Sequence, residues 1–141
     1  MARPDNEMTM ASSRTQKILL ADDERSLRLT TAKLMELAGF EVVLAADGIE
    51  AVARFKECEA QLSAVLLDLA MPRMDGLEAM RVMREVNPKV PIVLTTGSMD
   101  PLLEGAPEAD ARLEKPYTWE SLKRVFDRLG VSIGRLGEGD S

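Results

Sequence analysis

The sequence predicts an α/β domain in which helices cover both faces of a parallel sheet. Short apolar runs alternate along the chain with segments whose apolar residues recur at helical spacing. Each run is almost continuously apolar, as expected of strands that are buried on both faces. Acidic residues or hydroxyls stand where several of these runs end. Because ligands of open α/β sheets bind beyond the carboxyl ends of the strands, these positions are the first candidates for function.

The composition limits the classes of function. The 141 residues fit one domain, and the net charge of −6 argues against binding nucleic acid through a broad basic surface. The single cysteine, Cys58, excludes an internal disulfide and fits a reducing compartment. No apolar run approaches the roughly 20 residues of a membrane span, and no secretory signal is visible. We therefore expect a cytoplasmic protein without membrane insertion.

Histidine is absent from the chain. This excludes Ser-His-Asp and Cys-His catalysis, histidine-ligated zinc and histidine phosphotransfer by the chain itself. A thiolate metal cluster is excluded because there is only one cysteine. Carboxylates, lysine, hydroxyls and the backbone are left to perform any chemistry.

The first strand is expected at residues 17–21, where a short apolar run ends in Asp22 and Asp23. Residues 1–16 before it are polar and without periodicity, which predicts a disordered leader. The helix that follows ends at Gly39, a typical helix-terminating residue. Its buried face is predicted from apolar and small residues at i, i+4, i+7 and i+11, namely Leu27, Thr31, Leu34 and Ala38.

The second strand is expected at residues 41–45, and the third at residues 64–68, where four apolar residues precede Asp68. Between them lies a helix with an apolar side. The members of that side are Ala51, Val52, Phe55 and Cys58.

The loop after Asp68 carries strong turn residues. Pro72 restricts its backbone, and Asp75 is placed to cap the next helix. That helix must end near Pro88, because the residue before a proline disfavours helical conformation. Its inward side is outlined by Leu77, Met80 and either Met83 or Arg84.

The fourth strand, within residues 91–97, ends in the hydroxyls of Thr95 and Thr96. Two prolines and a glycine between residues 98 and 111 predict a short or irregular fourth helix. A last strand at residues 112–115 is closed by Pro116. The final helix, capped by Thr118 and ended by Gly130, is expected to bury Leu122, Phe126 and Leu129, and residues 130–141 are expected to form a flexible tail.

The elements alternate strand and helix five times, which predicts a doubly wound parallel sheet joined by right-handed crossovers. A flavodoxin-like strand order of 2-1-3-4-5 would place the first and third strands side by side. That arrangement would bring Asp22 and Asp23 next to Asp68.

Three neighbouring carboxylates repel one another unless a cation lies between them. Oxygen-only ligands suit Mg²⁺, which would leave Asp68 free to attack a phosphoryl group as a nucleophile. Thr96 could hydrogen-bond a phosphoryl oxygen, and Lys115 could supply a positive charge. Each residue alone has an ordinary explanation as a helix-dipole partner, a turn hydroxyl or a solvated lysine. Their occurrence together at four strand ends favours a phosphoryl-transfer site.

Residues 17–129 resemble the receiver domain of the two-component response regulator family. Four motifs carry the resemblance, and as a set they are highly specific. They are ILLADD at residues 18–23, LLDLAMPRMDGL at 66–77, TTG at 95–97 and KP at 115–116.

The resemblance implies that Asp68 accepts a phosphoryl group from a phosphohistidine of a histidine kinase or histidine phosphotransfer protein. It implies that Mg²⁺ is bound directly by Asp23 and Asp68, mostly through water by Asp22, and by the backbone carbonyl of Ala70. A downstream protein target is implied as well, without direct contact to nucleic acid. The chain would not be an enzyme beyond slow self-dephosphorylation.

The resemblance also implies that Thr96 and Lys115 hold the phosphoryl oxygens and that the Lys115-Pro116 peptide is cis. Phosphorylation would then switch the surface formed by the segment after Thr96, the last strand and the last helix.

Two features depart from the family pattern. Arg112 stands where the family usually has an aromatic residue, and the connection from Thr96 to Lys115 is a few residues shorter than usual. Both departures fall on the usual output surface, and Arg112 could pair instead with an acid or a partner protein. The shorter connection is more similar to receivers of hybrid histidine kinases than to receivers that drive DNA-binding domains.

Two other classes of function remain open. One is a phosphohydrolase with an aspartyl-phosphate intermediate, similar to haloacid dehalogenases. Those enzymes carry a second acid two residues after the nucleophile, where this chain has Ala70. The other class is a docking module that works without phosphorylation, and the complete set of acids argues against it.

Overall fold

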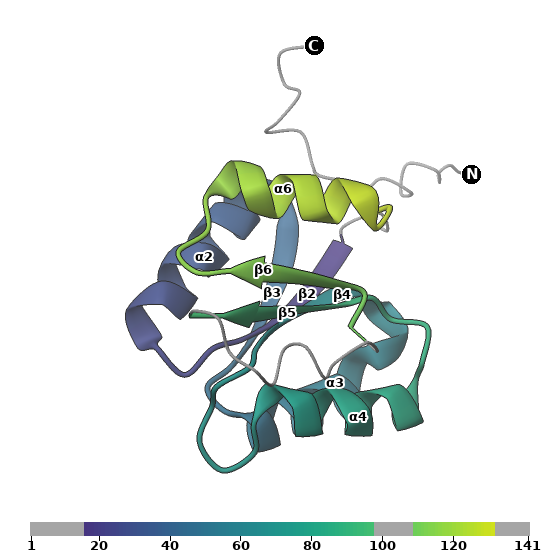
Figure 1. The fold of residues 1–141 in the computed structure, drawn as a ribbon. Helices are drawn as coiled ribbons and strands as arrows, with labels where there is room; N and C mark the ends of the chain where they lie inside the picture. Colours follow the sequence, from purple (N-terminus) through teal and green to yellow (C-terminus); the bar gives the residue numbers. More distant parts are fainter. Residues whose placement is uncertain (1–15, 98–108, 132–141) are drawn as a thin grey trace, which may run out of the picture.

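Five parallel strands form one sheet in the order β3-β2-β4-β5-β6, which runs through the centre of Figure 1. The computed structural model describes residues 16–97 and 109–131 of the chain. Counted along the chain the strand order is 2-1-3-4-5, so the predicted flavodoxin-like arrangement is confirmed. The strands are β2 (Gln16–Ala21), β3 (Phe40–Ala45), β4 (Leu62–Asp68), β5 (Ile92–Thr96) and β6 (Ala111–Glu114).

Helices cover both faces of this sheet. In Figure 1, α2 and α6 lie on one face, and α3 and α4 lie on the other. This three-layer arrangement follows from parallel strands that are joined through helical crossovers. Within the described residues the helices are α2 (Arg25–Leu37), α3 (Gly48–Cys58), α4 (Gly76–Val86) and α6 (Trp119–Arg128), with a short 3₁₀ helix at Glu59–Gln61. None of them is long and apolar enough to cross a bilayer.

The central strands supply both hydrophobic cores, because successive side chains of a strand point to opposite faces. In β2, Leu19 packs on the side of α3 and α4, whereas Ile18 and Leu20 pack on the side of α2 and α6. In β4, Val65 and Leu66 divide between the same two cores. Two-sided burial explains why these strands are apolar at nearly every position.

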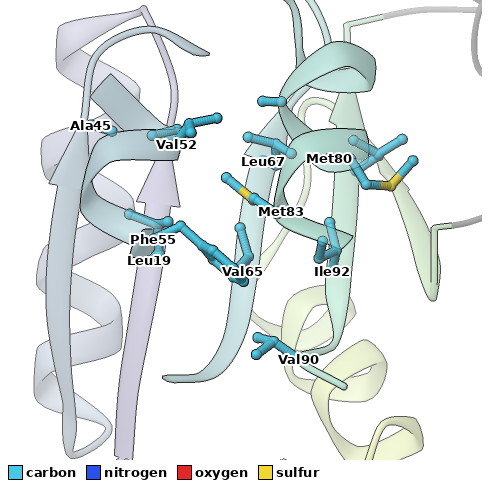
Figure 2. Packing of buried hydrophobic residues seen from close by; sticks show 14 of the residues in the cluster. Leu19, Ala45, Val52, Phe55, Val65, Leu67, Met80, Met83, Val90 and Ile92 are labelled. Atoms are coloured by element: carbon cyan, nitrogen blue, oxygen red, sulfur yellow. The ribbon is translucent and has the colours of Figure 1, made fainter. Parts of the chain in front are cut away.

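The core beneath α3 and α4 is shown in Figure 2. Phe55 of α3, Met80 and Met83 of α4 and the strand residues Val65 and Leu67 belong to one cluster, and all five side chains are buried. This packing holds β4, the strand that ends on Asp68, against the helices on this face.

Side chains cap the starts of three helices, and two of these caps, Asp75 and Thr118, confirm the prediction. The side chains of Asp47, Asp75 and Thr118 accept hydrogen bonds from backbone N–H groups in the first turns of α3, α4 and α6. Helix α4 ends at Val86 with Asn87 as its C-cap, directly before Pro88. These caps place the helix starts beside the strand ends where the candidate residues lie.

The buried face of α2 differs from the predicted one. The prediction that Leu34 is buried is wrong, since its side chain is 38% exposed, whereas Met35 and Ala32 are buried. Leu34 and Met35 lie three and four residues after Thr31, so both are its neighbours on the helix surface. The packing of α2 on the sheet buries only Met35. The sequence left open whether Met83 or Arg84 lies on the inward side of α4. Met83 is buried there, whereas Arg84 is only half-buried.

The described fold extends slightly beyond the predicted range of 17–129. Strand β2 begins at Gln16, and Val131 is buried and donates its backbone N–H to the Phe126 carbonyl at 2.9 Å. Gly130, with φ of 79°, makes the turn that allows this contact. The predicted leader, the irregular fourth helix and the tail otherwise lie outside the described residues.

Candidate functional site

The candidate residues follow or end four of the parallel strands. Residue Ala21 of β2 pairs with Leu67 of β4, so the next residues, Asp22 and Asp68, stand side by side at the carboxyl edge. Thr96 is the last residue of β5, and its partner in β6 directly precedes Lys115. The sheet order therefore gathers residues that lie far apart along the chain.

Three carboxylates meet at this edge. Asp22, Asp23 and Asp68 each present an oxygen atom within 4.8 Å of the others. Asp22 and Asp68 are buried, whereas Asp23 is exposed to solvent. The cluster is thus open on one side and enclosed by protein on the other.

The ammonium group of Lys115 contacts two of the three acids. Its Nζ lies 3.0 Å from Asp22 Oδ2 and 3.2 Å from Asp68 Oδ2, and only 16% of the lysine side chain is exposed. A half-buried cation between two buried carboxylates offsets their mutual repulsion. Lys115 is thereby placed directly beside the predicted nucleophile.

Negative charge exceeds positive charge at this site. Burial, together with the charges of Asp22 and Asp23, raises the pKa of Asp68 to about 6 even though Lys115 opposes the shift. Burial alone would lower the pKa of Lys115, but its contacts with Asp22 and Asp68 outweigh that effect and raise it. One lysine therefore does not neutralise the cluster, which leaves it attractive to a further cation.

Backbone contacts fix the loop that carries Asp22 and Asp23. The Glu24 N–H donates to Asp22 Oδ1 at 2.9 Å, and Arg28 Nη1 of α2 donates to the Asp22 carbonyl at 2.7 Å. The backbone N–H of Asp22 donates to the Ala45 carbonyl of the neighbouring strand at 3.1 Å. Asp22 is consequently held by both its backbone and its side chain.

The loop from Leu69 to Asp75 closes on itself beside Asp68. The Leu69 N–H donates to the Thr95 carbonyl, and the Gly76 N–H donates to the Leu69 carbonyl, each at 2.8 Å. Gly76 has no room for a side chain, since a Cβ there would overlap the backbone of Asp68. Ala70 lies within this loop, and a metal-binding role for its carbonyl stays a prediction.

The segment that carries Lys115 is tied to both neighbouring elements. The Lys115 N–H donates to the Thr96 carbonyl at 2.7 Å, and the Lys115-Pro116 peptide is cis, as the resemblance implied. The Tyr117 hydroxyl and Thr31 Oγ1 of α2 are 3.1 Å apart, within hydrogen-bond distance. Thr96 itself is buried.

The donor set fits a hard divalent cation. It offers only carboxylate oxygens, and the exposed side at Asp23 leaves room for water and a further ligand. Mg²⁺ prefers such sites, binding through a few carboxylates and keeping several waters.

An ion pair near the site was not predicted from the sequence. Arg73 Nη2 contacts Asp47 Oδ2 at 2.6 Å and links the loop after β4 to the start of α3. The pair spans 26 residues of the sequence. No local pattern in the sequence pairs these two residues, because only the sheet order brings their loops together.

Comparison with known proteins agrees with this geometry. Residues 18–127 match the family model of the response regulator receiver domain. The response regulator MprA from Mycobacterium sp. (strain KMS) is 36% identical over 109 residues, which are 75% of this chain and 46% of MprA. The chain thus spans about half the length of the curated relatives it matches.

Solved structures give the same result. The receiver domain of the sensor histidine kinase PA1611 from Pseudomonas aeruginosa PAO1 superimposes with a TM-score of 0.74 and 28% identity, over 82% of this chain and 98% of that one. That structure has a magnesium ion coordinated in its active site cleft. The Vibrio cholerae chemotaxis protein CheY4 superimposes with a TM-score of 0.73 and 30% identity, over the same shares of the two chains.

Proposed function

This chain belongs to the response regulator receiver domain family, and from that premise we propose that Asp68 accepts a phosphoryl group from a phosphohistidine on a partner protein. The observation that carries the proposal is the contact of the buried Asp68 carboxylate with Lys115, within a cluster of two further acids. A carboxylate enclosed in this way has an ammonium group beside it before any phosphate arrives.

In the proposed step a carboxylate oxygen of Asp68 attacks phosphorus. An O–P bond forms while the N–P bond to the donor imidazole breaks, and the bond electrons stay on the imidazole nitrogen. Asp68 must be ionised to attack, and with a pKa of about 6 most of it is ionised at pH 7. The donor ring carries a proton on its other nitrogen and so leaves as a neutral histidine, and the product on this chain is an aspartyl phosphate.

Mg²⁺ would be held by the carboxylates of Asp22, Asp23 and Asp68, and by the carbonyl of Ala70. When bound, the ion supplies charge neutralisation and polarises the phosphoryl oxygens. The cluster of three oxygen donors and the magnesium in the related PA1611 receiver support this assignment.

Lys115 and Thr96 would bind the transferred group. Lys115 Nζ already lies 3.2 Å from Asp68 Oδ2, so after the transfer its ammonium group can pair with a negatively charged phosphoryl oxygen. We assign the hydroxyl of Thr96, at the end of β5, to a second phosphoryl oxygen. Movement of Thr96 would shift the equilibrium of the surface around the end of β5, β6 and α6.

The proposed partners are a histidine kinase or a histidine phosphotransfer protein upstream and a protein target downstream, all in the cytoplasm. In this role the chain is a switch and not an enzyme, apart from slow self-dephosphorylation. The relatives include both a response regulator and a receiver of a sensor histidine kinase, so similarity to hybrid-kinase receivers stays a prediction.

Phosphotransfer profiling tests the proposal. The protein is incubated with a panel of phosphorylated histidine kinases and phosphotransfer proteins, with and without Mg²⁺, and the adduct is measured by intact mass. Wild type should gain one phosphoryl group only when Mg²⁺ is present, and Asp68→Asn should gain none. Asp75→Asn is the matched control, since asparagine preserves the cap of α4 and the adduct should persist.

Three results would contradict the proposal. An unchanged adduct in Asp68→Asn would exclude Asp68 as the acceptor. Rapid turnover of a small phosphomonoester would favour a phosphohydrolase. Failure to bind Mg²⁺ and to accept phosphate from any donor would favour a docking module.

A further inference from the structure

The loop between β4 and α4 contains a residue in an unfavourable backbone conformation. Arg73 has φ of 70°, in the left-handed region that residues with a side chain rarely adopt. No other non-glycine residue among the described ones has positive φ. Contacts made by the rest of the protein must therefore hold Arg73 in this conformation.

The side chain of Arg73 makes one such contact. Its Nη2 lies 2.6 Å from Asp47 Oδ2, while the other oxygen of Asp47 accepts the Glu50 N–H at 2.8 Å as the N-cap of α3. The Glu50 hydrogen bond and the Arg73 contact lower the pKa of Asp47, so the acid is ionised at neutral pH. Arg73 is thus joined to a carboxylate that is itself fixed to a helix end.

The backbone next to Arg73 makes a second contact with the same helix. A Cβ on Gly48, the first residue of α3, would overlap the carbonyl of Met74. The loop consequently touches the start of α3 both through the Arg73 side chain and through the Met74 backbone. At its other side the loop is closed by the hydrogen bond from Gly76 N–H to the Leu69 carbonyl.

The position of this pair connects it to the candidate metal site. Ala70, whose carbonyl is the proposed backbone ligand, lies three residues before Arg73 in the same closed loop. Arg73 itself is 62% exposed, so its ion pair adds little to global stability. The packing of the Met74 backbone against Gly48 offsets part of the cost of this conformation, so a weak ion pair can be enough to fix the side of the loop that carries Arg73.

We propose that Arg73 is a positioning residue, whose ion pair with Asp47 holds the β4–α4 loop in the conformation that binds Mg²⁺ through the Ala70 carbonyl. This role rests on the proposed function of the acidic cluster. Groups that orient a metal ligand from outside typically change metal affinity by about 10- to 100-fold when removed. Since Arg73 acts through one backbone ligand, an effect near the lower end of this range is expected.

The direction in which Mg²⁺ affinity changes when Arg73 is removed distinguishes a positioning role from a purely electrostatic one. Arg73 is a positive charge near a cation site, so removing it should strengthen Mg²⁺ binding if charge alone matters. If Arg73 positions the loop, removing it should weaken Mg²⁺ binding. The two explanations therefore predict opposite changes in the same measured constant.

The experiment titrates the 141-residue chain with MgCl₂ and measures the Kd by isothermal titration calorimetry. Arg73→Ala should raise the Kd about tenfold, while Arg73→Lys, which keeps the charge, should recover part of the affinity. Arg81→Ala removes an exposed arginine from α4 without touching the loop and should leave the Kd unchanged. Arg73→Gly relieves the backbone, so it should keep the thermal midpoint of unfolding while still weakening Mg²⁺ binding.

A double-mutant cycle with Asp47→Asn completes the test, because asparagine preserves the helix cap and removes only the charge. Combined with Arg73→Ala, it should weaken Mg²⁺ binding no more than either single change. Equal or tighter binding by Arg73→Ala, or additive losses in the double variant, would overturn the positioning role while leaving the proposed function intact. Absence of Mg²⁺ binding by the wild type would overturn both.

Discussion

Replacing Asp68 by asparagine should stabilise the metal-free protein at neutral pH. Burial, assisted by the charges of Asp22 and Asp23, raises the pKa of Asp68 from its ordinary 3.8 to about 6. Between these values the folded protein binds more protons at this carboxyl than the unfolded chain does. Its contribution to the free energy of unfolding therefore falls as the pH rises through this window.

The size of the effect follows from the shift. About two pKa units correspond to roughly 3 kcal/mol, because each unit is worth about 1.4 kcal/mol. Only 4% of the Asp68 side chain is exposed, so solvent screens it little. Asparagine has the same shape without the charge, and Lys115 keeps its contact with Asp22 at 3.0 Å. At roughly 4 °C per kcal/mol, the midpoint of thermal unfolding should rise by about 12 °C at pH 7.

The assay is thermal unfolding followed by circular dichroism, in EDTA, from pH 4 to pH 8. The variant should match the wild type near pH 4 and exceed it increasingly up to about pH 7. Asp127→Asn, which removes an exposed carboxylate from α6, is the control and should follow the wild type throughout. An Asp68→Asn variant no more stable than wild type at pH 7, or a difference independent of pH, would refute the electrostatic account of the site.

Three further changes test the structure around the site by urea unfolding at pH 7. Lys115→Met removes the ammonium group beside the buried carboxylates and should lower the free energy of unfolding by about 3 kcal/mol. An unchanged urea midpoint would show that this ammonium group does not stabilise the fold. Gly76→Ala forces a Cβ against the backbone of Asp68 and should cost about 2 kcal/mol, whereas Gly97→Ala, with open space around it, should behave as wild type. Thr118→Ala removes the cap of α6 and should cost about 1 kcal/mol; no loss would mean that the cap is dispensable.

The strands and helix ends could be predicted because their causes are local. An apolar run that ends at Asp68 predicts a buried strand, and Asp75 or Thr118 before a periodic segment predicts a helix start. The structure places β4 at Leu62–Asp68 and caps α4 and α6 with these two residues. Turn chemistry and periodicity depend on neighbours in the sequence, so they are visible without a structure.

The sequence did not show which of two adjacent apolar residues of a helix would be buried. Leu34 and Met35 are neighbours on α2, and either could have faced the sheet. Packing of the helix across the sheet buries Met35 and leaves Leu34 partly exposed. In α4, Met83 enters the core while Arg84 donates hydrogen bonds to the Pro88 and Val90 carbonyls. Such outcomes depend on the angle between elements, which no local pattern contains.

The succession of strands and helices along the chain, and the chemical groups at the strand ends, could be predicted because both depend on residues that are close together in the sequence. The fold, and no local pattern, brings Lys115 to Asp22 and Asp68 and brings Arg73 to Asp47. It also decided the raised pKa of Asp68, which depends on burial and on charges brought from another strand. Distances between segments far apart in the chain exist only once the sheet has formed.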